Sequence, residues 1–395
     1  MRKSLIAILG LAALISCKSE QVEPMSSRMV HSQMERCPQA TYLDYKPGKL
    51  SWSYTPGLEL KAFLDVYEAY GDQRIYDYVY DWYNEIVNED GTIQTYSVDS
   101  YNVDLICPGR SLFYFYDKTG DEKFLKAIQL IKTQIDGHPR VSEGAFWHKK
   151  VYPHQVWLDG VYMAEPFYVE YATRFLEGEA QQEAFAEIVN EFVVAEKYTY
   201  DPATKLYRHA WDESHSMFWC NPETGQSQHC WGRALGWFCM AMVEVLDYLP
   251  EDYAGRQTII DILRKVCAEL PKWADPESGM WYQVMDQPGR EGNYLEATCS
   301  AMFTYTFLKG VNRGYLDSSL APYAKGLYKG LVDTFISTDE NGFISLEKCC
   351  SVGGLGGSNN RMGDYAYYLS EPIRPNDSKG VGPFIWASLE IEQSK

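Results

Sequence analysis

The sequence lacks an excess of basic residues and lacks the cysteine and histidine patterns of a metal site. Its 36 Lys and Arg residues face 54 Asp and Glu residues, a formal charge of −18 that repels nucleic acid and anionic membrane surfaces. The ten cysteines form no Cys-x-x-Cys pair and no Cys/His cluster with zinc-site spacing, so we expect no bound metal. Disulfide pairing stays undetermined. Strand-like alternation is scarce as well, which argues against a β-rich fold.

The start of the chain differs in composition from the rest. Arg2 and Lys3 precede an apolar stretch from Leu5 to Ile15 that is too short to span a bilayer, and Cys17 follows soon after. This arrangement resembles a bacterial lipoprotein signal, which is cut before the cysteine. An ordinary signal peptide with an incidental cysteine is the alternative.

The resemblance to a lipoprotein signal predicts the domain organisation. Residues 1–16 would be the signal peptide, Cys17 the lipidated N-terminus, 17–45 a tether and 46–395 a single catalytic domain. We therefore expect a protein of the cell envelope, facing the periplasm or the cell surface, that touches the membrane only through its lipid.

The body of the chain has the periodicity of helices. From Leu58 onward, apolar residues recur at steps of three and four, with Gly, Asp or Pro between the segments. The pattern predicts helical pairs over 58–70 with 75–87, 104–116 with 122–135, 159–175 with 181–196, 231–249 with 256–273, 293–308 with 318–336 and, more weakly, 363–369 with 380–392.

Six helical hairpins are the number needed to close a ring of inner and outer helices, so the predicted fold is an all-α (α/α)6 barrel. The alternative is an open superhelical array of the tetratricopeptide kind, but no 34-residue consensus recurs. Long turn-rich gaps separate the helices, and we expect them to gather as loops at one mouth of the barrel, where sites are usually built; they cover residues 88–101, 139–158, 199–230 and 337–361.

Two acids stand at predicted helix entrances. Asp159 lies among aromatic and apolar residues, and burial there would raise its pKa and keep it ready to donate a proton. Asp104 precedes Pro108 and Gly109 at a second entrance and could act as its partner. Each acid could instead merely cap its helix, and paired carboxylates also serve hydrolases of saturated glycosides.

A further set of candidates combines a cation with aromatic rings. Arg233 could hold a substrate carboxylate by two hydrogen bonds, while Trp231 and Trp237 offer faces for a sugar ring. The alternative is an arginine paired with an internal aspartate, beside core tryptophans. His229 and His215 have no such company and are interpreted as ordinary loop residues.

The run at 157–167, WLDGVYMAEPF, resembles the signature of the unsaturated glycuronyl hydrolases of glycoside hydrolase family 105. The family has counterparts of the segments at 231–237, 278–286, 367–370 and 380–382, in the same order. The resemblance implies an (α/α)6 barrel without metal or organic cofactor. It also implies removal of a 4,5-unsaturated uronic acid from the non-reducing end of oligosaccharides that polysaccharide lyases produce, by hydration of the C4–C5 double bond.

The resemblance also assigns roles to residues. It implies that Asp159 is the general acid and base, Asp104 a second site carboxylate and His148 a site histidine. The positions that match substrate-facing residues are Tyr54, His209, Trp231, Arg233 and Trp237. Ala234 and Leu235 are bulkier than the residues common in the family, which puts the substrate choice in doubt.

Three functions stay open at this point. An unsaturated galacturonyl unit linked to rhamnose, from rhamnogalacturonan, is the first expectation for the substrate. Unsaturated glucuronyl units from ulvan or glycosaminoglycans are the nearest alternative. A sugar-binding lipoprotein without activity, or a hydrolase or epimerase of saturated sugars on the same barrel, would be of a different class.

Overall fold

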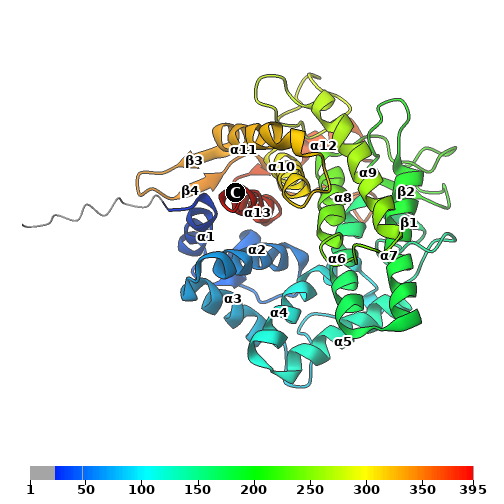
Figure 1. Cartoon of the computed structure of the whole chain (residues 1–395). Coiled ribbons are helices and arrows are strands. Elements are labelled where there is room, and N and C mark those ends of the chain that lie inside the picture. The colour runs from blue at the N-terminus through cyan, green and yellow to red at the C-terminus, as the bar shows by residue number, and fades with distance from the viewer. Residues whose placement is uncertain (1–22, 47, 395) are drawn as a thin grey trace, which may run out of the picture.

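Two concentric rings of helices make up the computed structural model, which describes residues 23–46 and 48–394 (Figure 1). The inner ring consists of α2 (Tyr54–Tyr70), α4 (Arg110–Thr119), α6 (Leu158–Phe175), α8 (Gly232–Val245), α10 (Ala297–Asn312) and α13 (Ser378–Glu392). The outer ring consists of α3 (Gln73–Ile86), α5 (Glu122–Gly137), α7 (Gly178–Thr199), α9 (Gly255–Glu269), α11 (Ala321–Phe335) and α1 (Met25–Arg36). The last inner helix packs on the first, α13 on α2, so the ring is closed. The predicted (α/α)6 barrel is confirmed, and the open array is excluded.

The two rings differ in how much of each helix is apolar. Every residue of α8 is buried, as expected for a helix surrounded by others. The outer helix α3 buries one stripe, Ile75, Val79, Trp82, Tyr83 and Ile86, and exposes polar residues elsewhere. This spacing along one face is the pattern from which the sequence predicted helices. Five predicted hairpins match the structure within a few residues, although the one at 104–116 begins with two 3₁₀ turns, η3 (Val103–Leu105) and η4 (Cys107–Gly109), before α4.

The prediction of a tether over 17–45 is wrong for its described part. Within that segment α1 packs against α13 and α2, with Met29 and Val30 fully buried, and η1 (Ala40–Tyr45) buries Leu43. The Ser, Gln and His residues of α1 concealed a short apolar stripe, whose main partner, α13, lies at the far end of the chain. Residues 1–22, with the expected signal peptide and Cys17, lie outside the described residues. No described helix is long and apolar enough to cross a membrane.

The predicted sixth hairpin, 363–369 with 380–392, is wrong in its first member. The chain there forms α12 (Tyr365–Ser370), a helix of only 6 residues, which is too short to line the barrel. It lies among the loops, where Tyr365 and Tyr368 are buried. Helix α1 takes the outer place beside α13 instead, as Figure 1 shows.

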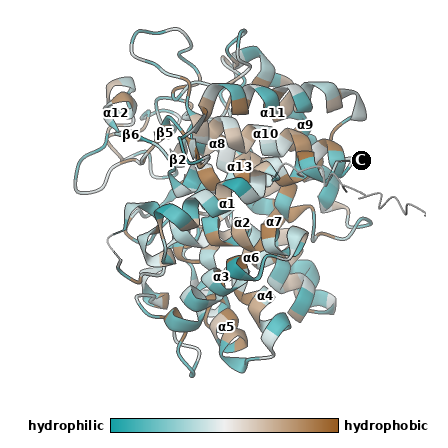
Figure 2. Cartoon of the chain, turned by 90° about the vertical axis from the view of Figure 1, so that its left-hand side faces the viewer, coloured by the Kyte–Doolittle hydropathy of each residue, from teal (hydrophilic) through white to brown (hydrophobic). Residues whose placement is uncertain are grey.

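The loops between the helices carry small antiparallel ladders. The strands are β1 (Gln155–Trp157) with β2 (Ala210–Asp212), β3 (Ile336–Thr338) with β4 (Ile344–Leu346), and β5 (Cys349–Cys350) with β6 (Ile373–Arg374). The remaining 3₁₀ turns are η2 (Val98–Ser100), η5 (Leu270–Trp273) and η6 (Ser318–Leu320). Figure 2 shows β2, β5, β6 and α12 gathered at one end of the helical body. We call this end, where β1 leads into α6 and β6 precedes α13, the mouth. The nine cysteines among the described residues are free thiols.

Candidate active site

Asp159 and His209 meet at the mouth because β1 and β2 pair. The ladder places Trp157 opposite Ala210, and the amide of Leu158 donates to the carbonyl of His209 at 3.1 Å. Asp159 Oδ2 then lies 3.2 Å from His209 Nε2. Neither atom has a hydrogen-bond partner with good geometry among the described residues. Both are therefore available to a molecule that enters the mouth.

The other nitrogen of the same histidine is held in place. His209 Nδ1 lies 2.8 Å from the hydroxyl of Tyr368, which comes from α12, and the imidazole is fully buried. Tyr368 was not predicted as a site residue. It does lie in the segment 367–370 that carries the family resemblance, and this was the available signal.

The predicted raised pKa of Asp159 is wrong. Burial does act in that direction, but the opposing effect of His209, His148 and Arg233 is larger and leaves the pKa below its ordinary value. The carboxyl is thus ionised in the free protein. Its interpretation as a helix cap is also wrong, since the α6 N-cap is Trp157 and makes no side-chain cap bond.

Asp104 lies beside His148, a contact that the sequence did not predict. Val103 donates its amide to the carbonyl of His148, which brings η3 to the loop before β1. Asp104 Oδ1 lies 3.6 Å from His148 Nε2, and Oδ2 lies 2.6 Å from Lys149 Nζ. Lys149 was not predicted, although it follows His148 directly. This ion pair, rather than helix capping, is the role of the Asp104 side chain.

His148 lies between Asp104 and the start of α6. A side-chain carbon at Gly160, the residue after Asp159, would lie only 3.1 Å from His148 Nδ1, so the imidazole packs directly on the start of α6. Burial lowers the pKa of His148 to about 4, despite the opposing charge of Asp104. The imidazole is therefore neutral at neutral pH.

Trp157 packs against both histidines. Its ring is parallel to that of His148 at 4.5 Å between centroids and to that of Tyr152 at 5.4 Å. It meets His209 edge-on at 5.1 Å. This stack fixes the orientation of the rings on the β1 side of the site.

Arg233 is a buried cation without a carboxylate partner among the described residues. Its Nη1 donates to the carbonyl of Cys350 at 2.5 Å, its Nε has no partner, and its guanidinium carbon lies 4.6 Å from the centre of the Trp231 ring. The interpretation of this arginine as one half of a structural ion pair is wrong. The guanidinium thus keeps at least one donor, Nε, without a partner among the described residues.

The prediction of open tryptophan faces is wrong. Trp231 is 1% exposed because Arg233 and Tyr368 lie against its ring and the loop at Gly353 covers it. Trp237 is equally buried, six residues further along α8, between Tyr162 and Tyr54.

Tyr54 is the first residue of α2, at the mouth, and its side chain is half-buried. Burial raises its pKa well above the usual range, so the phenol stays neutral. In the part of the chain that the structure describes, no group of three or more His, Cys, Asp or Glu side chains is arranged to hold a metal ion.

This closed helical barrel, with two carboxylates and two histidines at one mouth, has the architecture of the six-hairpin glycosidases. The family model described as Glycosyl Hydrolase Family 88 matches residues 25–395. A solved structure described as a family 105 glycoside hydrolase of C. acetobutylicum is 42% identical, with a TM-score of 0.89, and the match covers 94% of this chain and all of that one.

Among curated proteins, the unsaturated rhamnogalacturonyl hydrolase YesR of Bacillus subtilis is 27% identical over 301 residues, which cover 75% of this chain and 78% of YesR. Protein Atu3128 of Agrobacterium fabrum is 36% identical over 234 residues, or 58% of this chain and 97% of that protein. The chain matches the family model of glycosyl hydrolase family 88 and belongs to glycoside hydrolase family 105; it is a glycoside hydrolase of the unsaturated uronyl type.

A solved unsaturated glucuronyl hydrolase specific for heparin is 14% identical with a TM-score of 0.66 and covers 93% of this chain and 98% of its own. At that identity the similarity shows the fold alone.

Proposed function

We propose that the protein removes a 4,5-unsaturated galacturonyl unit from rhamnose in fragments of rhamnogalacturonan. The observation that carries the proposal is the pair of unpartnered atoms, Asp159 Oδ2 and His209 Nε2, at a mouth that also holds the uncompensated cation of Arg233. A proton donor and a carboxylate-binding group are what an unsaturated uronate needs. The name and 27% identity of YesR support the rhamnogalacturonan choice.

The reaction begins with protonation of the substrate double bond. Asp159 gives its proton to C4, and positive charge develops at C5 and the ring oxygen. Asp159 is ionised in the free protein partly because of Arg233. A uronate that pairs with this arginine neutralises its charge and expels water, and both changes favour the protonated acid.

Water completes the reaction. It adds at C5 and returns a proton to Asp159, so the acid is regenerated. The hemiketal that results opens, its hydroxyl proton passes to the departing sugar oxygen, and no covalent enzyme intermediate forms. The neutral imidazole of His148 packs on the start of α6, with Asp104 beside it, and both side chains can orient this water. Lys149 forms an ion pair with Asp104 and balances its charge.

The experiment follows the ultraviolet absorbance of the enol ether in the unsaturated galacturonyl–rhamnose disaccharide, with the saturated disaccharide as control. We expect loss only with the unsaturated sugar. Loss confined to unsaturated glucuronyl oligosaccharides would replace the galacturonyl assignment. No loss with either sugar would favour a binding protein without activity, and turnover of the saturated control would favour a different reaction.

Asp159→Asn removes the proton donor at nearly constant volume. We expect a loss of turnover of at least about 1,000-fold, comparable to the upper range for acid–base groups, with folding unchanged by circular dichroism. Unchanged turnover would refute the role of Asp159.

We also propose that the mature chain is anchored to the cell envelope by a lipid on Cys17. Only residues 18–24 separate this cysteine from α1, a stretch that reaches at most about 25 Å. Incorporation of a labelled fatty acid into the wild type and not into Cys17→Ala supports the anchor, and equal labelling of both contradicts it.

A further inference from the structure

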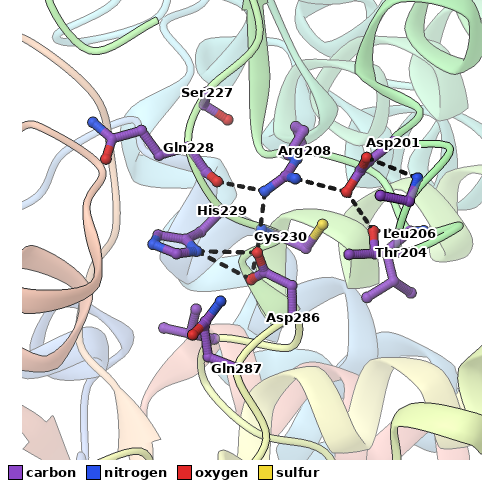
Figure 3. A network of polar contacts seen from close by, with 12 residues as sticks. Asp201, Thr204, Leu206, Arg208, Ser227, Gln228, His229, Cys230, Asp286 and Gln287 are labelled. Atoms are coloured by element: carbon purple, nitrogen blue, oxygen red, sulfur yellow. Dashed lines mark hydrogen bonds and ion pairs between the residues drawn. The ribbon is translucent and has the colours of Figure 1, made fainter. Parts of the chain in front are cut away.

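The segment 278–286 carries part of the family resemblance, yet none of its residues contacts Asp159 in the site described above. It ends in Asp286, whose side chain is 5% exposed and accepts from three donors (Figure 3). Oδ2 lies 3.1 Å from Arg208 Nη1 and 3.0 Å from His229 Nδ1, and Oδ1 accepts from the amide of Cys230 at 3.2 Å. A buried carboxylate that accepts from charged and backbone donors strongly restrains the positions of the segments that carry those donors.

Two of the three donors to Asp286 stand next to a residue of the site. Arg208 directly precedes His209, and Cys230 directly precedes Trp231. The two segments also contact each other, because the amide of His209 donates to the carbonyl of His229 at 3.3 Å. The carboxylate of Asp286 therefore joins the two segments that carry the site histidine and the ring beneath Arg233.

The same segment is tied to the site by further bonds. The amide of Met285 donates to the carbonyl of Cys230 at 2.9 Å, and Trp231 Nε1 donates to Gln283 Oε1 at 3.1 Å. On the other side, Arg208 Nη2 donates to Asp201 Oδ2 at 2.6 Å. Arg208 is thus held between two carboxylates, as Figure 3 shows, and cannot turn without breaking both pairs.

We propose that Asp286 is a positioning residue for the hydrolysis, which acts through Arg208 and His229 to hold His209 against Asp159. The inference rests on the proposed function for its kinetic consequence. A displacement of His209 by about 1 Å would weaken its contact with Asp159 Oδ2, now 3.2 Å, and errors of that size cost up to about 100-fold in rate. His229, interpreted from the sequence as an ordinary loop residue, is part of this cluster.

The test compares Asp286→Asn with Asp275→Asn. Asp275 lies just before the same segment. Its carboxylate accepts hydrogen bonds from the amide of Ser278 at 2.8 Å and from the hydroxyl of Ser278 at 2.7 Å, but it contacts no site residue. For Asp286→Asn we expect a 10- to 100-fold fall in kcat with KM changed less than threefold. We also expect a shift in the pH profile of kcat, because the proton affinity of Asp159 depends on His209, His148 and Arg233. Asp275→Asn should stay within twofold of the wild type.

Two further measurements keep the proposal falsifiable. If Asp286→Asn does not fold, His229→Gln removes one bond to the same carboxylate and should show the same changes at smaller size. NMR of ¹⁵N-histidine-labelled protein, with His209 assigned by His209→Asn, reports the imidazole without any substrate. If the wild type were inactive on all unsaturated sugars, the proposed function would be rejected. A shifted His209 signal in Asp286→Asn would still support the positioning of His209 by Asp286.

Two results would overturn the proposal. An unchanged His209 signal and an unchanged pH profile in Asp286→Asn would overturn the proposal. An equal loss of activity in Asp275→Asn would do so too, because it would show that the segment acts only through general stability.

Discussion

Glu59 offers a test of how the barrel closes. It lies in α2 with no exposed surface and accepts from Gln33 Nε2 of α1 at 2.6 Å and from the hydroxyl of Ser378 at the start of α13. One carboxyl therefore joins the three helices at the seam of the ring. Burial raises its pKa from 4.5 to about 7, although the two hydrogen bonds oppose this shift.

The sign and size of the effect on stability follow from that pKa. Below pH 4.5 the carboxyl is protonated in both the folded and the unfolded chain and costs nothing. As pH rises to about 7, the unfolded chain ionises while the folded one keeps its proton, so stability falls by about 1.4 kcal/mol per pH unit. The total loss is about 3 kcal/mol and is complete above pH 7.

Glu59→Gln imitates the protonated carboxyl at every pH. We expect it to match the wild type near pH 4.5 and to exceed it by about 3 kcal/mol at pH 8. With an unfolding entropy of about 2.1 cal/mol/K per residue over roughly 370 residues, this corresponds to about 4 °C in Tm. Differential scanning calorimetry at several pH values between 4.5 and 8 measures the difference.

The comparison with the wild type isolates this one group. Other buried carboxyls with raised pKa values, such as Glu165 and Glu191, are present in both proteins and cancel. Glu183→Gln, an exposed substitution on α7, is the matched control and should shift Tm by less than 1 °C at each pH, about the size of a surface effect. A difference between Glu59→Gln and the wild type that does not change with pH would refute the reasoning.

Two further predictions concern the site. Arg233→Ala should raise KM for the unsaturated disaccharide about 10- to 100-fold, because a charge-assisted hydrogen bond to the uronate contributes about 1.5 to 3 kcal/mol; an unchanged KM in steady-state kinetics would contradict carboxylate binding by this residue. Because the pKa of Asp159 in the free protein lies below its ordinary value and catalysis needs the protonated form, log kcat/KM should fall by about one for each pH unit between 5 and 7. A flat or rising kcat/KM over that interval would show that another group donates the proton.

The sequence predicted those parts of the fold that depend on local periodicity. Helices with a continuous apolar stripe, such as α3, could be identified because burial repeats every three or four residues. The place of α1 could not be predicted, because its short stripe has meaning only against α13 and α2. The segment 363–369 has helical periodicity, but a helix of one to two turns can equally lie in a loop, so the sequence did not show whether it lines the barrel.

The same distinction applies to the site. Asp159, Asp104 and His148 could be named as candidates from the sequence, because Asp159 lies in the run at 157–167, His148 precedes it by eleven residues and Asp104 stands at a predicted helix entrance. The ionisation of Asp159 was not predicted, because the aromatic neighbours in sequence indicated burial, while His209 approaches from fifty residues further along the chain. The face of Trp231 is covered by Gly353, 122 residues away in sequence, and that of Trp237 by Tyr54, 183 residues away.

The contact between α1 and α13 has a consequence for the order of events during synthesis. Ser26 donates its amide to Glu392 at 3.0 Å, across 366 residues. At about 5 to 20 residues per second, the ribosome needs about 20 to 70 s to make the chain between them. During that time the first outer helix, α1, can contact α2 but not α13, and the barrel stays open. The ring can therefore close only after its last helix has been made, so the native barrel forms after synthesis of nearly the whole chain.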